Sequence, residues 1–180
     1  TLFQMEAVAG DTTIGHATAY VQCLEALGGA IVPARAQALR ALALELERLA
    51  NHVGDIGALS NDVGFLPTAA YCGRLRGDLL NMTATVCGSR FGRGLVRPGG
   101  VAFDLDDGLA AKLLEMLDRA GRDLKGAVAL FFDTESVRGR MESTGVLSAE
   151  TCRSLGIVGM AARAAGVSRD CRVYQPAGWY

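Results

Sequence analysis

The 180-residue chain lacks the features that mark a membrane-spanning or a disulfide-stapled protein. No apolar run reaches the eighteen or so residues that a spanning helix needs, so we expect no transmembrane helix in this chain. The five cysteines are scattered, odd in number and never form a C-x-x-C pair. This argues against a disulfide framework and leaves no zinc or iron–sulfur signature. We expect reduced thiols, most of them buried.

Catalytic motifs are equally scarce. The chain has only two histidines, His16 and His52, and contains neither G-x-S-x-G nor the phosphate-binding G-x-x-x-x-G-K-S/T. A hydrolase and a nucleotide-binding module therefore have no support. The formal charge of -1 gives no reason to expect nucleic acid as a partner.

Half of the residues are hydrophobic and only 6% are aromatic, with alanine and leucine abundant, which favours helices. The sequence predicts a mainly α fold, an antiparallel helical bundle built on one long central helix at about 33–62. Large apolar residues recur along this helix at alternating spacings of three and four, namely Leu39, Leu42, Leu46, Leu49, Val53 and Ile56. Beside them runs a strip of small residues seven apart, where a neighbouring backbone can approach closely: Ala36, Ala43, Ala50 and Gly57.

Further helices are predicted at about 14–27, 68–91 and 106–133, and another begins near 148. The glycine-rich segment 92–103 predicts a short loop or hairpin. Residues 1–10 read as a strand or a buried connection, and 135–144 as irregular. Because no linker or repeat interrupts the pattern, we expect residues 1–180 to form a single helical domain. The first residue is Thr1 rather than Met, which suggests an excised internal fragment of a longer subunit.

A polar stripe follows the other side of the long helix. Glu45, Arg48, His52 and Asp55 are three or four apart, so each can touch the next. A solvated helix face accounts for such a pattern, and a metal site would need more converging ligands. Asp62 ends the helix among apolar neighbours. If it is buried there, its pKa would be raised and it would be a candidate for proton handling.

Three segments, GDTTIGHATAYVQCLEALGG, VPARAQALRALALELERLANHVGDIGALSNDVG and VRPGGV, resemble the large subunit of membrane-bound nickel–iron hydrogenases of the formate-hydrogenlyase and energy-converting type. They equally resemble the quinone-pocket (D) subunit of respiratory complex I. The resemblance covers about 9–103 well and 156–180 more loosely. It implies a peripheral subunit at the cytoplasmic side of the inner membrane, docked on an iron–sulfur small subunit and on membrane-arm subunits.

The resemblance also bears on metal binding. Hydrogenases of this family carry an R-x-C-G-x-C-x-x-x-H segment whose two cysteines bind nickel and iron. In this chain the two cysteine positions hold Ala9 and Thr12, the glycine is Gly10 and the histidine is His16. Alanine offers no donor atom and a hydroxyl is a poor substitute for a thiolate, so we expect no nickel–iron centre and no metal ligand here.

The complex I pattern is also only partly present. The tyrosine that complex I uses as a quinone ligand falls on Gly10, and a histidine near its terminal iron–sulfur cluster falls on Gly92. Asp62 does match the pocket carboxylate that complex I uses to couple quinone chemistry to proton movement.

The arginines Arg76, Arg90 and Arg97 match as well, as cluster-side or structural residues, and Glu45 with His52 matches on the long helix. The resemblance therefore implies a scaffold that has been kept while its active pocket has changed.

The implied function is proton-coupled electron transfer from an iron–sulfur cluster in a partner subunit to quinone or a related acceptor. The cluster would lie close to His16 and Arg90, the acceptor near Gly10 and Thr12, and Asp62 would relay the proton. This chain would bind no cofactor of its own beyond quinone, and in isolation it would be inactive. Two alternatives stay open: a scaffold that has lost both sets of ligands, and a packing role for His16 and Arg90.

Overall fold

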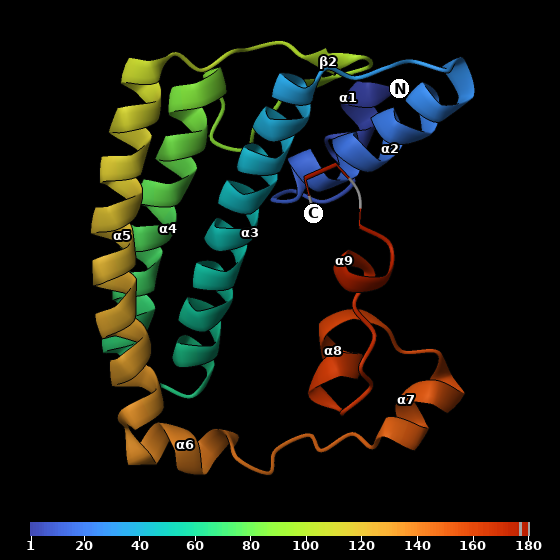
Figure 1. Cartoon of the computed structure of the whole chain (residues 1–180). Coiled ribbons are helices and arrows are strands. Elements are labelled where there is room, and N and C mark those ends of the chain that lie inside the picture. The colour runs from blue at the N-terminus through green and yellow to red at the C-terminus, as the bar shows by residue number, and fades with distance from the viewer. Residues whose placement is uncertain (177, 180) are drawn as a thin grey trace.

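The computed structural model describes residues 1–176 and 178–179. Three long helices, α3 (Ala34–Asp62), α4 (Leu66–Cys87) and α5 (Asp107–Asp133), run antiparallel along one side of the molecule (Figure 1). α4 lies between the other two and packs extensively against both. The predicted mainly α fold, with its long helix at about 33–62, is confirmed.

Gly57, at the C-terminal end of the small-residue strip on α3, allows α4 to approach closely. Ala43 and Ala50 are buried, and a Cβ atom added at Gly57 would lie only 3.1 Å from Cys72 Cβ of α4. Leu46 and Val53 of the apolar face are almost completely buried in the main core. Close helix contact at the small residues therefore lets the neighbouring large side chains interdigitate.

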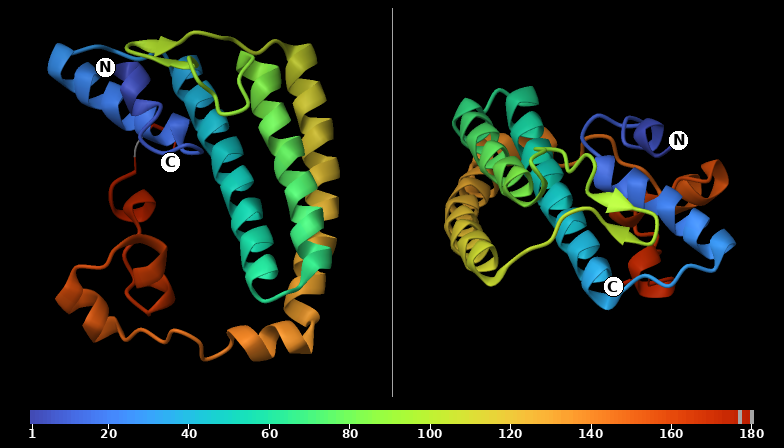
Figure 2. Two further views of the ribbon diagram at one scale, coloured as in Figure 1. Left: turned by 180° about the vertical axis from the view of Figure 1, so that it is seen from behind. Right: turned by 90° about the horizontal axis from the view of Figure 1, so that it is seen from above.

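A second group of elements covers the face of α3 that lies away from α5, as Figure 2 shows from above. It consists of α1 (Leu2–Met5), α2 (Thr13–Gly28) and a hairpin of β1 (Val96–Arg97) and β2 (Gly100–Val101). In the hairpin, Val96 pairs with Val101 and Arg97 with Gly100. This confirms the predicted hairpin.

The chain ends in four short helices, α6 (Glu135–Met141), α7 (Ala149–Leu155), α8 (Gly159–Ala164) and α9 (Cys171–Tyr174). α6 follows α5 directly, and the chain then returns beside α3 (Figure 1).

An ion pair and a hydrogen bond between described residues help to attach this returning segment to α3. Arg172 Nη1 lies 3.0 Å from Glu45 Oε1, and Trp179 Nε1 donates to the carbonyl of Ala34 at 3.2 Å.

Three sequence predictions about local structure were wrong. Residues 1–10 contain the short helix α1, whose first turn is closed by Thr1 and Gln4. The segment 135–144 is largely helical, since α6 occupies most of it. The helix expected to reach 91 ends at Cys87, because Gly88 adopts a left-handed conformation with φ of 75°. Among the described helices, none has both the length and the apolar character needed to cross a membrane.

Candidate functional site

The loop 9–12, where the sequence places the acceptor, lies against the middle of α3. Asn51 Nδ2 of α3 donates to the carbonyl oxygen of Asp11 at 3.2 Å. From α4, Arg76 Nη2 lies 3.5 Å from the carboxylate of Asp11. The loop that begins α2 is therefore fixed by one polar contact from each of the two central helices.

Glu47 lies directly beneath this loop and caps α2. Its two carboxylate oxygens accept the backbone N–H groups of Ile14 at 2.7 Å and Gly15 at 3.0 Å. These N–H groups belong to the first turn of α2, where backbone N–H groups have no carbonyl acceptor within the helix. Burial raises the pKa of Glu47, the two N–H bonds act in the opposite direction, and the negative charge of Asp11 adds to the rise. A carboxyl group whose pKa is raised by burial thus lies beneath the loop 9–12.

The space enclosed around Glu47 is very small. A cavity of about 10 Å³ separates Asp11 and Glu47 from Arg90 and Phe91, which is at the limit for one water molecule. A quinone headgroup cannot enter it. An acceptor bound by this region would have to lie against the outer side of the loop.

Gly92, the residue that the resemblance places at the position of the complex I histidine, lies against α2. A Cβ atom added there would lie 2.4 Å from Ile14 Cδ1, far inside van der Waals contact, and the backbone φ of 71° disfavours any side chain. Ile14 is itself fully buried. A side chain at position 92 would therefore require that Ile14 move aside.

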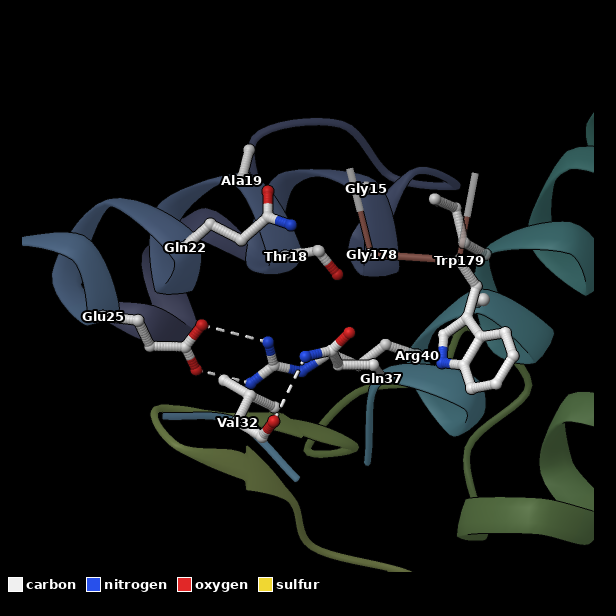
Figure 3. A pocket seen from close by; sticks show the side chains of 12 residues that line it. Gly15, Thr18, Ala19, Gln22, Glu25, Val32, Gln37, Arg40, Gly178 and Trp179 are labelled. Carbon is white, nitrogen blue, oxygen red and sulfur yellow. Dashed lines mark hydrogen bonds and ion pairs between the residues drawn. The ribbon is translucent and has the colours of Figure 1, made fainter. Parts of the chain in front are cut away.

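A larger cavity of about 300 Å³ lies between α2 and α3 and is shown in Figure 3. Thr18, Gln22, Gln37 and Trp179 surround it (Figure 3). Thr18 Oγ1 is buried and has no hydrogen-bond partner among the described residues. This cavity offers polar groups to a small ligand, but none of the residues that line it was singled out for chemistry by the sequence.

One wall of that cavity is a buried ion pair. Arg40 of α3 donates to both oxygens of Glu25 of α2, at 2.7 and 3.1 Å, and both side chains are 7% exposed. Arg40 also donates to the carbonyls of Arg97 and Gly100, while Gly99 N–H donates to Glu25. The bond from Arg40 holds the pKa of Glu25 below its usual value. The R-P-G-G-V motif is thus a turn bound by a guanidinium and a carboxylate.

The predicted polar stripe is only partly connected. Arg48 Nε donates to Glu45 Oε2 at 2.9 Å, as its spacing indicates. His52 and Asp55 are exposed, and within the part of the chain that the structure describes they make no ion pair or side-chain hydrogen bond. This part of α3 is a solvated helix face within the chain.

Asp62 does not meet the loop 9–12. It is exposed at the end of α3, so the burial that would make it a candidate for proton handling is not found. It follows Asn51, the residue that touches the loop, by eleven positions, or about 16 Å along a helix. A proton relay between the two places would have to cross that distance.

The remaining predicted residues lie near the loop. His16 is half-buried in the first turn of α2, and Arg90 is exposed beside the small cavity next to Glu47. Arg97 extends over the ring of Phe3, with its guanidinium carbon 5.9 Å from the ring centre. Ala9 and Thr12 carry no thiolate, and the described residues contain no cluster of three or more His, Cys, Asp or Glu that could hold a metal ion.

Sequence reasoning missed Glu47, Arg40 and Glu25. A signal for the first two was present, because positions 36, 40, 43, 47 and 50 continue the three-and-four spacing of the small-residue strip. A charge placed among residues that must be buried needs a partner, and both charges have one. Nothing in the spacing of α2 marks Glu25 in the same way.

Comparison with known proteins identifies the family. The sequence model for "Respiratory-chain NADH dehydrogenase, 49 Kd subunit" matches residues 62–180. The chain belongs to this family. The D subunit of NADH-quinone oxidoreductase from Akkermansia muciniphila is 35% identical over 158 residues, which cover 88% of this chain and 38% of the relative.

Two further members of the 49 kDa family extend the comparison. The D subunit of F(420)H(2) dehydrogenase from Methanosarcina mazei is 33% identical over 157 residues, covering 87% of this chain and 42% of the relative. NADH-quinone oxidoreductase subunit 4 of Thermus thermophilus is 33% identical over 168 residues, covering 93% and 41%. The chain therefore spans about two fifths of the length of these relatives.

Proposed function

We propose that the chain is part of a catalytic-type subunit of a membrane-attached complex, in which electrons from an iron–sulfur partner and protons are delivered to quinone or a related acceptor. The observation that carries this proposal is membership of the 49 kDa family, whose match covers residues 62–180. The relatives are named as subunits of NADH-quinone and F(420)H(2) dehydrogenases. The complex would lie at the cytoplasmic side of the inner membrane.

In this proposal the acceptor lies against the outer side of the loop 9–12, between this chain and a partner subunit. His16 and Arg90 face the iron–sulfur cluster of that partner, and the cation of Arg90 stabilises negative charge on the reduced acceptor. Glu47, buried beneath the loop, can hold a proton close to the acceptor. Asp62, exposed at the end of α3, takes protons from solvent and begins the relay that leads to Glu47 and the acceptor.

A non-catalytic scaffold is the second candidate, and two observations favour it. Gly10 has no side chain that could bind a headgroup, and a side chain at Gly92 would meet Ile14 at 2.4 Å. In that case the subunit would only join an iron–sulfur small subunit to membrane-arm subunits.

The test is Asp62→Asn in the intact complex. We expect acceptor-linked turnover to be abolished while all subunits remain assembled, because asparagine keeps the shape of the side chain and cannot carry a proton. Turnover is measured as acceptor reduction in purified complex, and assembly as subunit stoichiometry by native mass spectrometry.

Asp118→Asn on the exposed surface of α5 is the matched control and should retain full turnover. Wild-type activity in Asp62→Asn would remove Asp62 from proton transfer. A complete absence of acceptor-linked turnover in the wild-type complex would favour the scaffold.

A further inference from the structure

A cleft of about 780 Å³ lies between α3 and the segment that carries α7, α8 and α9. Its α3 wall bears Arg48 and His52 of the polar stripe. Its other wall bears the remaining arginines of the cleft, namely Arg153, Arg163, Arg169 and Arg172. We call this the arginine cleft. It shares no lining residue with the cavity of Figure 3 or with the space beside Glu47.

The arginine cleft carries more positive charge than its ion pairs with described carboxylates neutralise. Glu45 pairs with Arg48 and with Arg172, and Asp170 lies 4.0 Å from Arg163. Five arginines and two carboxylates leave a formal excess of three positive charges, whereas the whole chain has a net charge of -1.

Two of the five arginines make no ion pair with a described residue. These are Arg153 and Arg169, which have no ion-pair partner within residues 1–176 and 178–179 and are both exposed. The excess of positive charge is therefore local and open to a partner from outside the chain.

The chemistry of the walls indicates the size of that partner. The side chains of Arg48, Arg163 and Arg172 are 46%, 41% and 37% exposed, so they can rotate to meet a large surface but do not enclose a small ion. Apolar groups accompany them: Val158 is 74% exposed and Met160 60% exposed. An apolar patch surrounded by arginines is typical of a protein interface.

We propose that the arginine cleft is the docking site for an acidic segment of a partner subunit, one in which aspartate or glutamate residues alternate with apolar residues. Guanidinium groups bind carboxylates in a bidentate geometry, which suits such a segment. Its apolar side chains would cover Val158 and Met160. This inference rests on the proposed function, because it requires that the chain work within a complex of several subunits.

Photo-cross-linking in the intact complex tests the proposal. A benzophenone amino acid replaces Val158, and the cross-linked peptide is sequenced by mass spectrometry. We expect a segment of another subunit that contains several acidic residues. Arg153→Glu together with Arg169→Glu should lower the cross-link yield about tenfold or more at physiological salt, because like charges then face each other.

The matched control is Lys112→Glu together with Arg122→Glu on the exposed surface of α5, which makes the same change in net charge and should leave the yield unchanged. Replacing the acidic residues of the captured segment by lysine should restore the yield in the doubly reversed variant. Cross-links to a second copy of this chain or to lipid alone, or a yield that charge reversal does not change, would overturn the proposal.

A second measurement needs no charge reversal. Cys171 is exposed and lines the cleft, and Cys23 is exposed on α2. In the wild-type complex, alkylation of Cys171 should be slowed at least about tenfold relative to the denatured protein, and about 1 M salt should abolish the slowing. Equal alkylation rates of Cys171 at low and at high salt would contradict docking. Cys23 is the control, because its alkylation rate reports how accessible exposed thiols are in general. Turnover in the same preparations separates the two proposals, because the cross-link can be present when acceptor reduction is absent.

Discussion

Arg40 ties three parts of the molecule together through one guanidinium group. It binds Glu25 of α2 and the carbonyls of Arg97 and Gly100 in the hairpin, from its own place on α3. A guanidinium can make this set of bonds because its five N–H groups spread in one plane. The buried pair therefore fixes the hairpin and α2 on α3, at the cost of removing two charges from water.

The Glu25–Arg40 pair should make the stability of the protein depend on pH. Because the pKa of Glu25 is lowered in the folded state, the pair contributes fully above the usual glutamate pKa of about 4.3. That contribution is lost as the pH falls through the lowered folded value. Glu25→Gln should lower the free energy of unfolding by about 3–5 kcal/mol at pH 7 and flatten this acid dependence.

Urea unfolding of the purified chain between about pH 3 and 7 measures both effects. Asp104→Asn, which breaks an exposed ion pair with Arg35, is the control and should change stability little. An equally small loss for Glu25→Gln would mean that the buried pair does not stabilise the fold.

Gly92 and Gly88 allow backbone strain to be separated from side-chain overlap. Gly92→Ala places a methyl group on a backbone with φ of 71° and 2.4 Å from Ile14. Gly88→Ala places one on a backbone with φ of 75° and with nothing within 4 Å. We expect Gly88→Ala to destabilise by about 1 kcal/mol and Gly92→Ala by about 2–4 kcal/mol. Thermal unfolding compares them, and equal losses would show that Ile14 moves aside freely.

At the scale of the elements, periodicity located all three long helices. Apolar residues at spacings of three and four predicted α3, α4 and α5, because such a face is buried only if the segment is helical. α1 and α6 escaped prediction because each is less than two full turns of helix and has no periodic face of its own. Their conformation depends on local capping and on where the preceding element leaves the chain.

The sequence indicated the loop 9–12 and did not indicate the acid beneath it. The resemblance pointed to residues 9–12, whereas Glu47 accepts the N–H of the nearby Ile14 across 33 positions of sequence. Asp62 stood out because it follows an apolar stretch at a helix end, yet its side chain is exposed there. Tertiary proximity of this kind is not encoded in local spacing.

The packing of α3 on α4 depends on the small-residue strip. Gly57→Leu should destabilise by about 1–3 kcal/mol, because even its Cβ atom would meet Cys72 at 3.1 Å and force the helices apart. Gly121→Leu on α5 is the control, since nothing lies within 4 Å of its added Cβ atom and leucine favours helix. Differential scanning calorimetry measures both variants, and a melting temperature unchanged by Gly57→Leu would show that the strip is not tightly packed.

At the scale of the whole molecule, the segment with α7, α8 and α9 is the least attached part. The extensive contacts between described elements involve α1 to α6 and the hairpin, and none of them includes α7, α8 or α9. The arginine cleft lies where this segment returns beside α3. A partner bound in that cleft would therefore also fix the segment with α7, α8 and α9 against α3.

Limited proteolysis should separate the weakly attached segment with α7, α8 and α9 from the rest of the molecule. The connection 142–148 is largely exposed, and Glu142 follows α6 directly. A glutamate-specific protease should cut first after Glu142, because Glu115 lies within the regular backbone of α5.

After the cut, the C-terminal piece should stay bound at low salt and separate at about 1 M salt, where the Arg172–Glu45 ion pair is screened. Gel filtration of the nicked protein measures this. A first cut within α5, or a piece retained at high salt, would contradict the expected division.

The contact between Gly92 and Ile14 makes the two positions depend on each other. A Cβ atom at position 92 would lie 2.4 Å from Ile14 Cδ1, so a side chain there requires that the buried Ile14 move aside or become smaller. A smaller residue at position 14 would by itself leave a cavity. We therefore expect substitutions at positions 92 and 14 to be non-additive, with each one reducing the cost of the other.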